Sequence, residues 1–200
     1  MTKLSAYRLM RHRAVDAVVI GTLLLLFTVE VTAQLSNSRA QALGHLSPLT
    51  SAAWEDEHPV IARYVDFVHE FHGNEDWQSE LNSIYAEEVF FADSFTTLED
   101  RSGLLRYFQN LRDASQPMRL KVLDVLEGEQ GTYLVWQIET EFVFFGSEKK
   151  VSSMGGTLFR FDEQGQIVFQ KDFWDSTEGF FEHVPLLGAL IEAVRERVAA

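Results

Sequence analysis

After Pro117 the hydrophobic pattern of the chain changes to a period of two, and this change constrains the fold more than any other feature. Side chains of a β-strand point alternately to the two faces of a sheet, so this period predicts strands. Turn residues at Gly146–Glu148 and Asp162–Gly165 separate neighbouring stretches, which is typical of antiparallel neighbours. The four expected strands are Met118–Leu126, Tyr133–Phe145, Lys150–Phe161 and Ile167–Trp174.

The part of the chain that precedes these strands is mainly helical in pattern. Pro59–His72 has apolar residues at helical spacing and begins with a proline, which suits a first helical turn. Two more helices are expected at Trp77–Tyr85 and Arg101–Leu111, with a short strand, Val89–Asp93, between them. Helices followed by antiparallel strands indicate an α+β fold. Three helices on one face of a curved antiparallel sheet would enclose a cone-shaped space, and a C-terminal helix, Val184–Val198, would follow.

The first 33 residues have the layout of a secretory signal peptide. A basic start precedes the apolar run Ala17–Val29, and Val31 and Ala33 then stand two positions apart. The run is short for a membrane span, which needs about 20 residues. An uncleaved anchor remains open if Asp16 and Glu30 reach the membrane interfaces.

We therefore expect three parts. Residues 1–33 are a signal peptide or membrane anchor, 34–56 a linker and 57–200 the folded domain. This organisation predicts an extracytoplasmic protein, either periplasmic or secreted, or one tethered to the membrane by its N-terminal segment. A misassigned start codon, with a soluble protein starting downstream, is the alternative.

The charge and the absence of cysteine exclude several classes of function. The net charge is −13, and an acidic body repels phosphate backbones, so no nucleic-acid partner is expected. Without cysteine the chain has no disulfide, no thiolate catalyst and no cysteine-type zinc site. His69 and His72 are three apart with no evident third ligand, so we expect no metal site and no cofactor.

Three stretches resemble the nuclear transport factor 2-like superfamily, and within it the SnoaL-like and ketosteroid-isomerase-like proteins. They are Tyr85–Glu88 leading to Asp93, Phe159–Ile167 and Asp172–Asp175, within a resemblance that covers about residues 57–176. The resemblance implies a cone-shaped fold with one pocket for a small hydrophobic molecule, and a possible homodimer through the outer sheet face. The superfamily includes isomerases, cyclases, hydrolases and pocket proteins without known activity, so the fold alone does not name a reaction.

The resemblance also implies roles for particular residues. Asp93 falls where ketosteroid isomerase has its general base, and Tyr64 falls near its oxyanion tyrosine. Thr157 stands where that enzyme has a second oxyanion acid, and a threonine is a weaker donor than a protonated carboxylic acid. Asp172 fits one acid of the Asp-Arg-Asp set of limonene epoxide hydrolase, but the strand Trp136–Phe142 has no arginine. Neither of these two activities is therefore expected.

The candidate catalytic residues are Asp93 as a base, Asp172 as an acid or water-orienting group, and Tyr64 as a hydrogen-bond donor. Each has a structural alternative: Asp93 can cap its loop through Ser94 or Thr96, Asp172 can pair with a surface cation, and Tyr64 can be a core tyrosine. Apolar and small side chains that share the inner face are the candidate ligand contacts, or plain core. These residues are Phe91, Trp136, Phe142, Thr157, Phe159 and Trp174.

Two functions remain open at this point. One is an isomerase-like or hydrolase-like enzyme that moves a proton on, or adds water to, a small hydrophobic substrate. The other is a binding or assembly module with the same pocket and no turnover. Apolar residues after the last strand, Phe180, Phe181, Pro185, Leu186, Leu187 and Leu190, are expected either to cover the mouth of the cone or to form a dimer seam.

Overall fold

The computed structural model describes residues 46–49, 53–144, 147–184 and 186–199. The expected signal peptide or anchor, 1–33, lies outside the described residues, as does most of the expected linker. Ser47–Ala200 forms one compact unit. No helix within the described ranges is long and apolar enough to cross a membrane.

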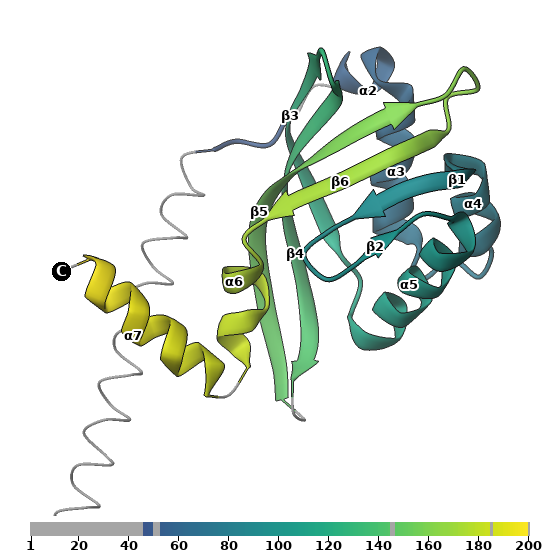
Figure 1. Cartoon of the computed structure of the whole chain (residues 1–200). Coiled ribbons are helices and arrows are strands. Elements are labelled where there is room, and N and C mark those ends of the chain that lie inside the picture. The colour runs from purple at the N-terminus through teal and green to yellow at the C-terminus, as the bar shows by residue number, and fades with distance from the viewer. Residues whose placement is uncertain (1–45, 50–52, 145–146, 185, 200) are drawn as a thin grey trace, which may run out of the picture. The chain divides into compact units, whose positions relative to one another are not determined.

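The domain contains a six-stranded sheet with the strand order β2-β1-β6-β5-β4-β3 (Figure 1). The last four strands pair antiparallel with their neighbours in sequence, as the period of two predicts. β1 pairs parallel with β6, which the sequence pattern did not indicate. The strands are β1 Tyr85–Ala92, β2 Thr97–Leu98, β3 Arg119–Gly128, β4 Gly131–Phe144, β5 Ser147–Phe161 and β6 Ile167–Trp174.

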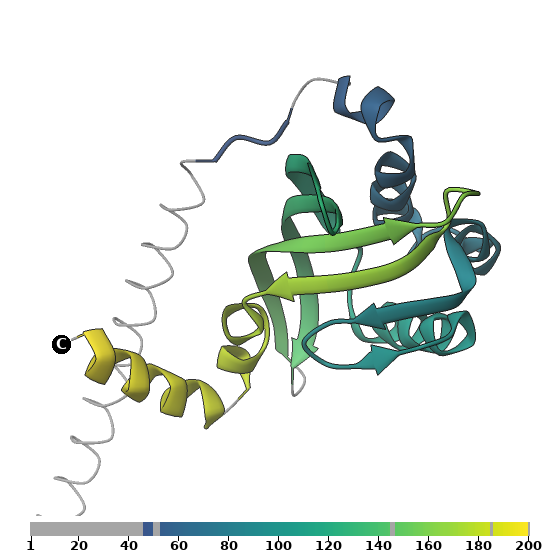
Figure 2. The same ribbon diagram turned by 45° about the horizontal axis from the view of Figure 1, so that its top comes forward.

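Three helices, α3, α4 and α5, gather on one side of the sheet (Figure 2), so the expected α+β architecture is confirmed. A short helix, α2, overlaps the end of the range 34–56 that was expected to be a linker. The C-terminal segment forms two short helices before its long one, which begins at Leu187 and not at Val184. The helices are α2 Ala53–Glu57, α3 Pro59–Glu70, α4 Trp77–Ile84, α5 Arg101–Ala114, α6 Ser176–Gly179, η1 Phe181–His183 and α7 Leu187–Ala199.

The core lies between these helices and the sheet, and phenylalanines form its centre. Phe67 of α3 and Phe71, which caps the end of that helix, are four residues apart, and both rings contact Phe108 of α5, at centroid distances of 5.3 and 5.6 Å. Phe67 and Phe71 are fully buried. Each such ring contributes about 1.5–3 kcal/mol through burial, so these contacts fasten α3 and α5 to each other.

The start of α5 is fixed beside the start of β1. Asp100 caps the helix by accepting a hydrogen bond from the backbone N–H of Gly103 at 2.6 Å. Arg101 donates to the backbone oxygen of Tyr85 at 3.0 Å. These bonds set the position of α5, which carries Tyr107 to the end of β1.

Asp93 lies just beyond β1, and not within a strand as expected. β1 ends at Ala92, and the backbone N–H of Asp93 donates to the oxygen of Thr96, which closes the turn into β2. The turn ends the strand here because the Asp93 side chain bonds the backbone of its own loop, as the next section describes.

Candidate functional site

The inner face of the sheet carries a line of hydrogen bonds from β4 through β5 to β6. The indole Nε1 of Trp136 donates to Thr157 Oγ1 at 2.9 Å, and Thr157 Oγ1 donates to Asp172 Oδ1 at 2.9 Å. An indole nitrogen only donates, so it uses an acceptor lone pair of the threonine and leaves the threonine proton for the carboxylate. Asp172 and Thr157 are direct partners across β5 and β6.

A glycine makes room for this arrangement. A Cβ at Gly155 would lie 2.6 Å from Cη2 of Trp136, closer than van der Waals contact allows. The indole therefore lies across β5 only because position 155 has no side chain. This is a close approach of the kind for which strands retain glycine.

Gln170 completes the network and was not predicted from the sequence. Its side chain is 1% exposed. Its Oε1 accepts from the hydroxyl of Tyr85 at 2.6 Å, and its Nε2 donates to Asp172 Oδ1 at 3.0 Å and to the Tyr64 hydroxyl at 3.4 Å. The available signal was alternation, because Gln170, Asp172 and Trp174 share one face of β6.

Asp172 is the carboxyl with a strongly altered acidity. Burial, the largest cause, and the charge of Asp93 raise its pKa from 3.8 to about 6, while the hydrogen bonds from Gln170 and Thr157 and the charge of Lys171 oppose the rise. Its Oδ1 accepts two hydrogen bonds, whereas its Oδ2 has one long contact, 3.3 Å from Gln170 Nε2. Oδ2 therefore retains the capacity to accept a proton or a hydrogen bond.

The expected surface cations have other partners. Lys150 pairs with Glu141 at 3.3 Å, and Arg160 donates to the backbone oxygen of Gln130 at 2.8 Å. Lys171 donates to the backbone oxygen of Asp93 at 3.4 Å. Among the described residues Asp172 forms no salt bridge with any of these three cations, although the charge of Lys171 lowers its pKa.

Tyr64 lies beside this carboxyl from the helix side. Burial and then the charge of Asp172 raise its pKa well above the ordinary value, so the hydroxyl keeps its proton. That hydroxyl accepts from Gln170, and within the described part of the chain its own proton has no acceptor. Tyr64 is 7% exposed and its ring packs edge-on against Phe159 at 5.0 Å.

The Asp93 carboxylate is bonded at both oxygens. Oδ1 accepts from the backbone N–H groups of Phe95 and Thr96, both at 2.8 Å, and Oδ2 accepts from the hydroxyl of Tyr107 at 2.5 Å. Burial and the charge of Asp93 raise the pKa of Tyr107, which stays protonated as the donor. The structure thus forms the loop cap that the sequence offered as an alternative for Asp93.

The predicted ligand contacts divide into three groups. Thr157 and Trp136 belong to the polar network, while Phe91 and Phe159 are buried in the core beside Tyr107 and Tyr64. Phe142 and Trp174 are partly exposed and contact aromatic rings outside the network. His69 and His72 lie elsewhere: His69 is hydrogen-bonded to the backbone of Leu120, and His72 to the side chain of Ser115.

The described residues thus combine one carboxyl of nearly neutral pKa, one tyrosine with a proton to donate, and buried aromatic side chains beside them. The hydrogen bonds from Thr157 and Gln170 hold the carboxyl in one orientation. Such a set can exchange a proton with an apolar molecule while donating a hydrogen bond to it.

Residues 61–170, more than half of the chain, match the SnoaL-like domain family. A nuclear transport factor 2-like protein of unknown function from Exiguobacterium sp. 255-15 superposes with a TM-score of 0.50 at 16% identity, over 58% of this chain and 98% of its own. A candidate SnoaL-like polyketide cyclase from Shewanella denitrificans OS-217 gives 0.53 at 14% identity, over 61% and 92%. One from Shewanella putrefaciens CN-32 gives 0.53 at 11% identity, over 62% and 92%. No curated protein matches the chain in sequence. At these identities the likeness shows the fold.

Proposed function

Because the chain belongs to the SnoaL-like domain family, a family of small-molecule-binding folds, we propose that it binds a small hydrophobic molecule against the inner sheet face and moves a proton on it. The observation that carries this proposal is Asp172. Its carboxyl combines a pKa of about 6 with an oxygen, Oδ2, that has spare acceptor capacity. A proton-transfer group works best when its pKa lies near the working pH.

In this proposal the other residues of the network have distinct roles. Tyr64 donates its free proton to an oxygen of the ligand and stabilises negative charge that develops there. Thr157 and Gln170 orient the carboxyl of Asp172. The resemblance places Asp93 as the base, but both of its carboxylate oxygens accept hydrogen bonds, from its own loop and from Tyr107. We therefore assign the base role to Asp172.

Hydrogen–deuterium exchange of a model ketone tests the proposal. We would incubate 2-tetralone, a flat apolar ketone with acidic α-protons, with the protein in D₂O near pH 7 and follow loss of the α-proton signals by NMR. We expect the native chain to accelerate exchange and Asp172→Asn to abolish it. Asp113→Asn, at an exposed carboxylate of α5, is the matched control and should retain full activity.

Two outcomes would contradict these assignments. If Asp93→Asn abolished exchange and Asp172→Asn did not, the base would be Asp93. If the native chain bound 2-tetralone without exchange, and related ketones behaved alike, the protein would be a binding module. One observation favours that second function. Thr157 and Tyr107 donate their hydroxyl protons to the two carboxylates, so neither hydroxyl is left to donate to a reacting ligand.

We also propose export by the N-terminal segment, since a basic start and an apolar run precede the domain. Fractionation of cells that express the full chain or a chain lacking residues 2–33 tests this. The full chain should be recovered outside the cytoplasm or in membranes, and the shortened one in the cytoplasm. Recovery of both in the same fraction would contradict it.

A further inference from the structure

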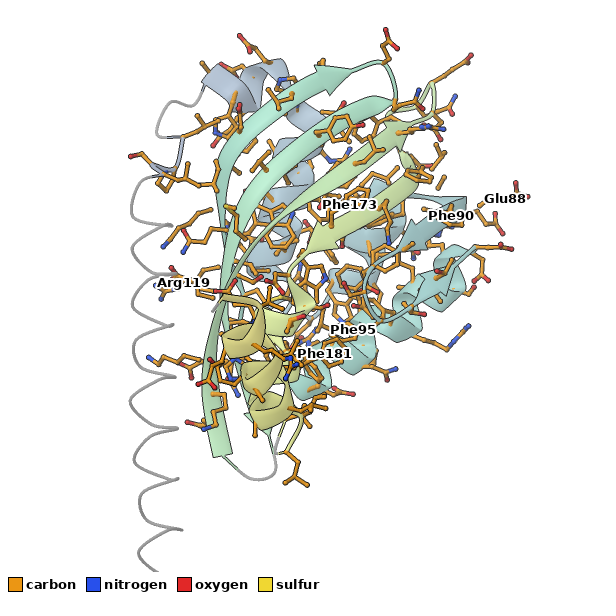
Figure 3. The ribbon with its side chains drawn as sticks, turned by 60° about the vertical axis from the view of Figure 1, so that its left-hand side comes forward. Glu88, Phe90, Phe95, Arg119, Phe173 and Phe181 are labelled. Atoms are coloured by element: carbon orange, nitrogen blue, oxygen red, sulfur yellow. The ribbon has the colours of Figure 1, made fainter. Side chains whose placement is uncertain are left out.

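Five aromatic rings meet where β6 ends: Phe95, Phe142, Trp174, Phe180 and Phe181. We call three of them, Phe95, Phe180 and Phe181, the aromatic plug. Phe95 lies 5.1 Å from Phe180 and 6.2 Å from Phe181, and Phe180 and Phe181 are 5.6 Å apart. Figure 3 shows Phe95 and Phe181 next to each other, one from the β1–β2 turn and one from the C-terminal segment.

The plug packs against Trp174 and Phe142, the two predicted ligand contacts whose partners lie outside the polar network. Phe95 packs on Trp174 at 5.5 Å, and Phe180 stands edge-on to Phe142 at 6.3 Å. Trp174 shares its face of β6 with Asp172, two residues away, which in a strand is a distance of about 7 Å. The plug therefore contacts the side chain next to the proposed proton-transfer group.

The position of Phe95 depends on Asp93. The two backbone N–H groups that Asp93 Oδ1 accepts are those of Phe95 and Thr96, so this carboxylate holds the loop in the conformation that places the ring. Tyr107 holds the carboxylate in turn. The Asp93–Tyr107 pair thus anchors one side of the plug.

The other side of the plug is carried by short elements. Asp175 caps α6 through the N–H groups of Thr177 and Glu178. A Cβ at Gly179 would lie 2.3 Å from Cζ3 of Trp174, so only a glycine lets α6 rest on the indole. α6 has four residues, of which only Gly179 is buried, and η1 has three residues, none of them buried. Phe95, on the other side of the plug, is 48% exposed. Such a segment can detach without opening the main core.

A buried hydroxyl without a partner lies under this cover. Ser153 is fully buried on the inner face of β5, and a Cβ at Gly179 would be 3.3 Å from the Ser153 Cβ. Within the described residues its Oγ has no hydrogen-bond partner. An unpaired buried polar group costs free energy that a ligand oxygen would recover.

We propose that the aromatic plug occupies part of the ligand site and that the ligand displaces it. The ligand class is a flat apolar ring that bears an oxygen: the ring takes the place of Phe180 against Phe142 and Phe95, and the oxygen bonds the hydroxyl of Ser153. Edge-to-face contacts such as those of Phe180 are the geometry in which aromatic rings attract each other. This inference deepens the proposed function and rests on its binding site, but not on turnover.

Equilibrium binding of 2-naphthol to the full chain, measured by calorimetry, tests the plug. A ligand that must displace a closed cover has its affinity lowered by the fraction of open molecules. If the plug is closed in nine molecules of ten, the double variant Phe180→Ala/Phe181→Ala should bind about tenfold more tightly than the native chain. Val198→Ala, at an 82% exposed position of α7, is the control and should leave affinity unchanged. Equal or weaker binding by the double variant, or no binding by either protein, overturns the proposal.

Two further measurements separate the parts of the proposal. Ser153→Ala should weaken binding of 2-naphthol by roughly three- to tenfold and leave binding of naphthalene, which has no oxygen, unchanged. Saturation of the native chain with 2-naphthol should speed amide hydrogen exchange in 176–184, and slower exchange there contradicts displacement even if the double variant fails to fold. The same binding measurement in an Asp172→Asn background separates failure of the plug from failure of the proposed proton transfer. The gain in affinity on replacing Phe180 and Phe181 should persist there whether or not the protein catalyses proton exchange.

Discussion

Replacing Asp172 by asparagine should remove a specific dependence of stability on pH. In the folded chain burial raises the pKa of this carboxyl from 3.8 to about 6. Between those values the folded chain holds a proton that the unfolded chain releases. The free energy of unfolding therefore falls as pH rises through this range and stays low above pH 6.

The size of the effect follows from the shift. A difference of about two pKa units corresponds to about 3 kcal/mol between strongly acidic and neutral solution. Measurements between pH 5.0 and 7.5 stay above the pI of 4.8. Across this interval the free energy of unfolding should fall by about 1.4 kcal/mol because of Asp172. Asp172→Asn is neutral throughout, so relative to the native chain the variant should gain about 1.4 kcal/mol of stability across this interval.

Urea denaturation followed by tryptophan fluorescence measures this difference. Native chain, Asp172→Asn and the exposed control Asp113→Asn would each be unfolded at several pH values. Any hydrogen bond that the amide loses relative to the carboxyl lowers the stability of the variant equally at every pH, so this loss cancels when the values at two pH values are subtracted. A native-minus-variant difference that stays within about 0.3 kcal/mol from pH 5.0 to 7.5 would refute the desolvated carboxyl, as would the same trend in Asp113→Asn.

Three other changes have defined outcomes. Thr157→Val removes a hydrogen bond that lowers the pKa of Asp172, so the midpoint of the pH-dependent difference should move upward; an unchanged midpoint in the same urea series would contradict the contact. Phe108→Ala should lower the free energy of unfolding by about 3–5 kcal/mol through the cavity it leaves, whereas Leu190→Ala at an exposed site should change it by less than about 0.5 kcal/mol. The outer sheet face exposes 53% of Phe173, so if a homodimer forms there, Phe173→Lys should shift the sedimentation of the full chain from dimer to monomer; a dimer that persists in the variant would place the interface elsewhere.

Local pattern was sufficient for most of the elements. The alternation of side chains placed β6 at Ile167–Trp174, the residues at which the structure has it, and the proline and apolar spacing placed the start of α3 at Pro59. Strand ends were less well predicted, since β5 begins at Ser147, within an expected turn. The parallel pairing of β1 with β6 was not predicted, because a strand's own residues do not specify its neighbour across the sheet.

The candidate site was predictable in part. Alternation placed Asp172 and Trp174 on one face of β6, and the same rule would have added Gln170, whose amide joins Tyr64, Tyr85 and Asp172. The bond between Tyr107 and Asp93 was beyond reach, because it depends on how α5 is placed against the end of β1.

The sequence by itself determined which segments are helices and strands and which side chains face inward, since both follow from periodicities of a few residues. Tertiary structure alone decided how the surroundings of the two carboxyls differ. Asp93 is bonded at both oxygens by its own loop and by Tyr107, whereas Asp172 is desolvated among groups from α3, β4 and β5 and its Oδ2 has one long contact, with Gln170. Desolvation and hydrogen bonding depend on segments that meet only in the folded chain, so acidity is a property of the fold and not of the residue type.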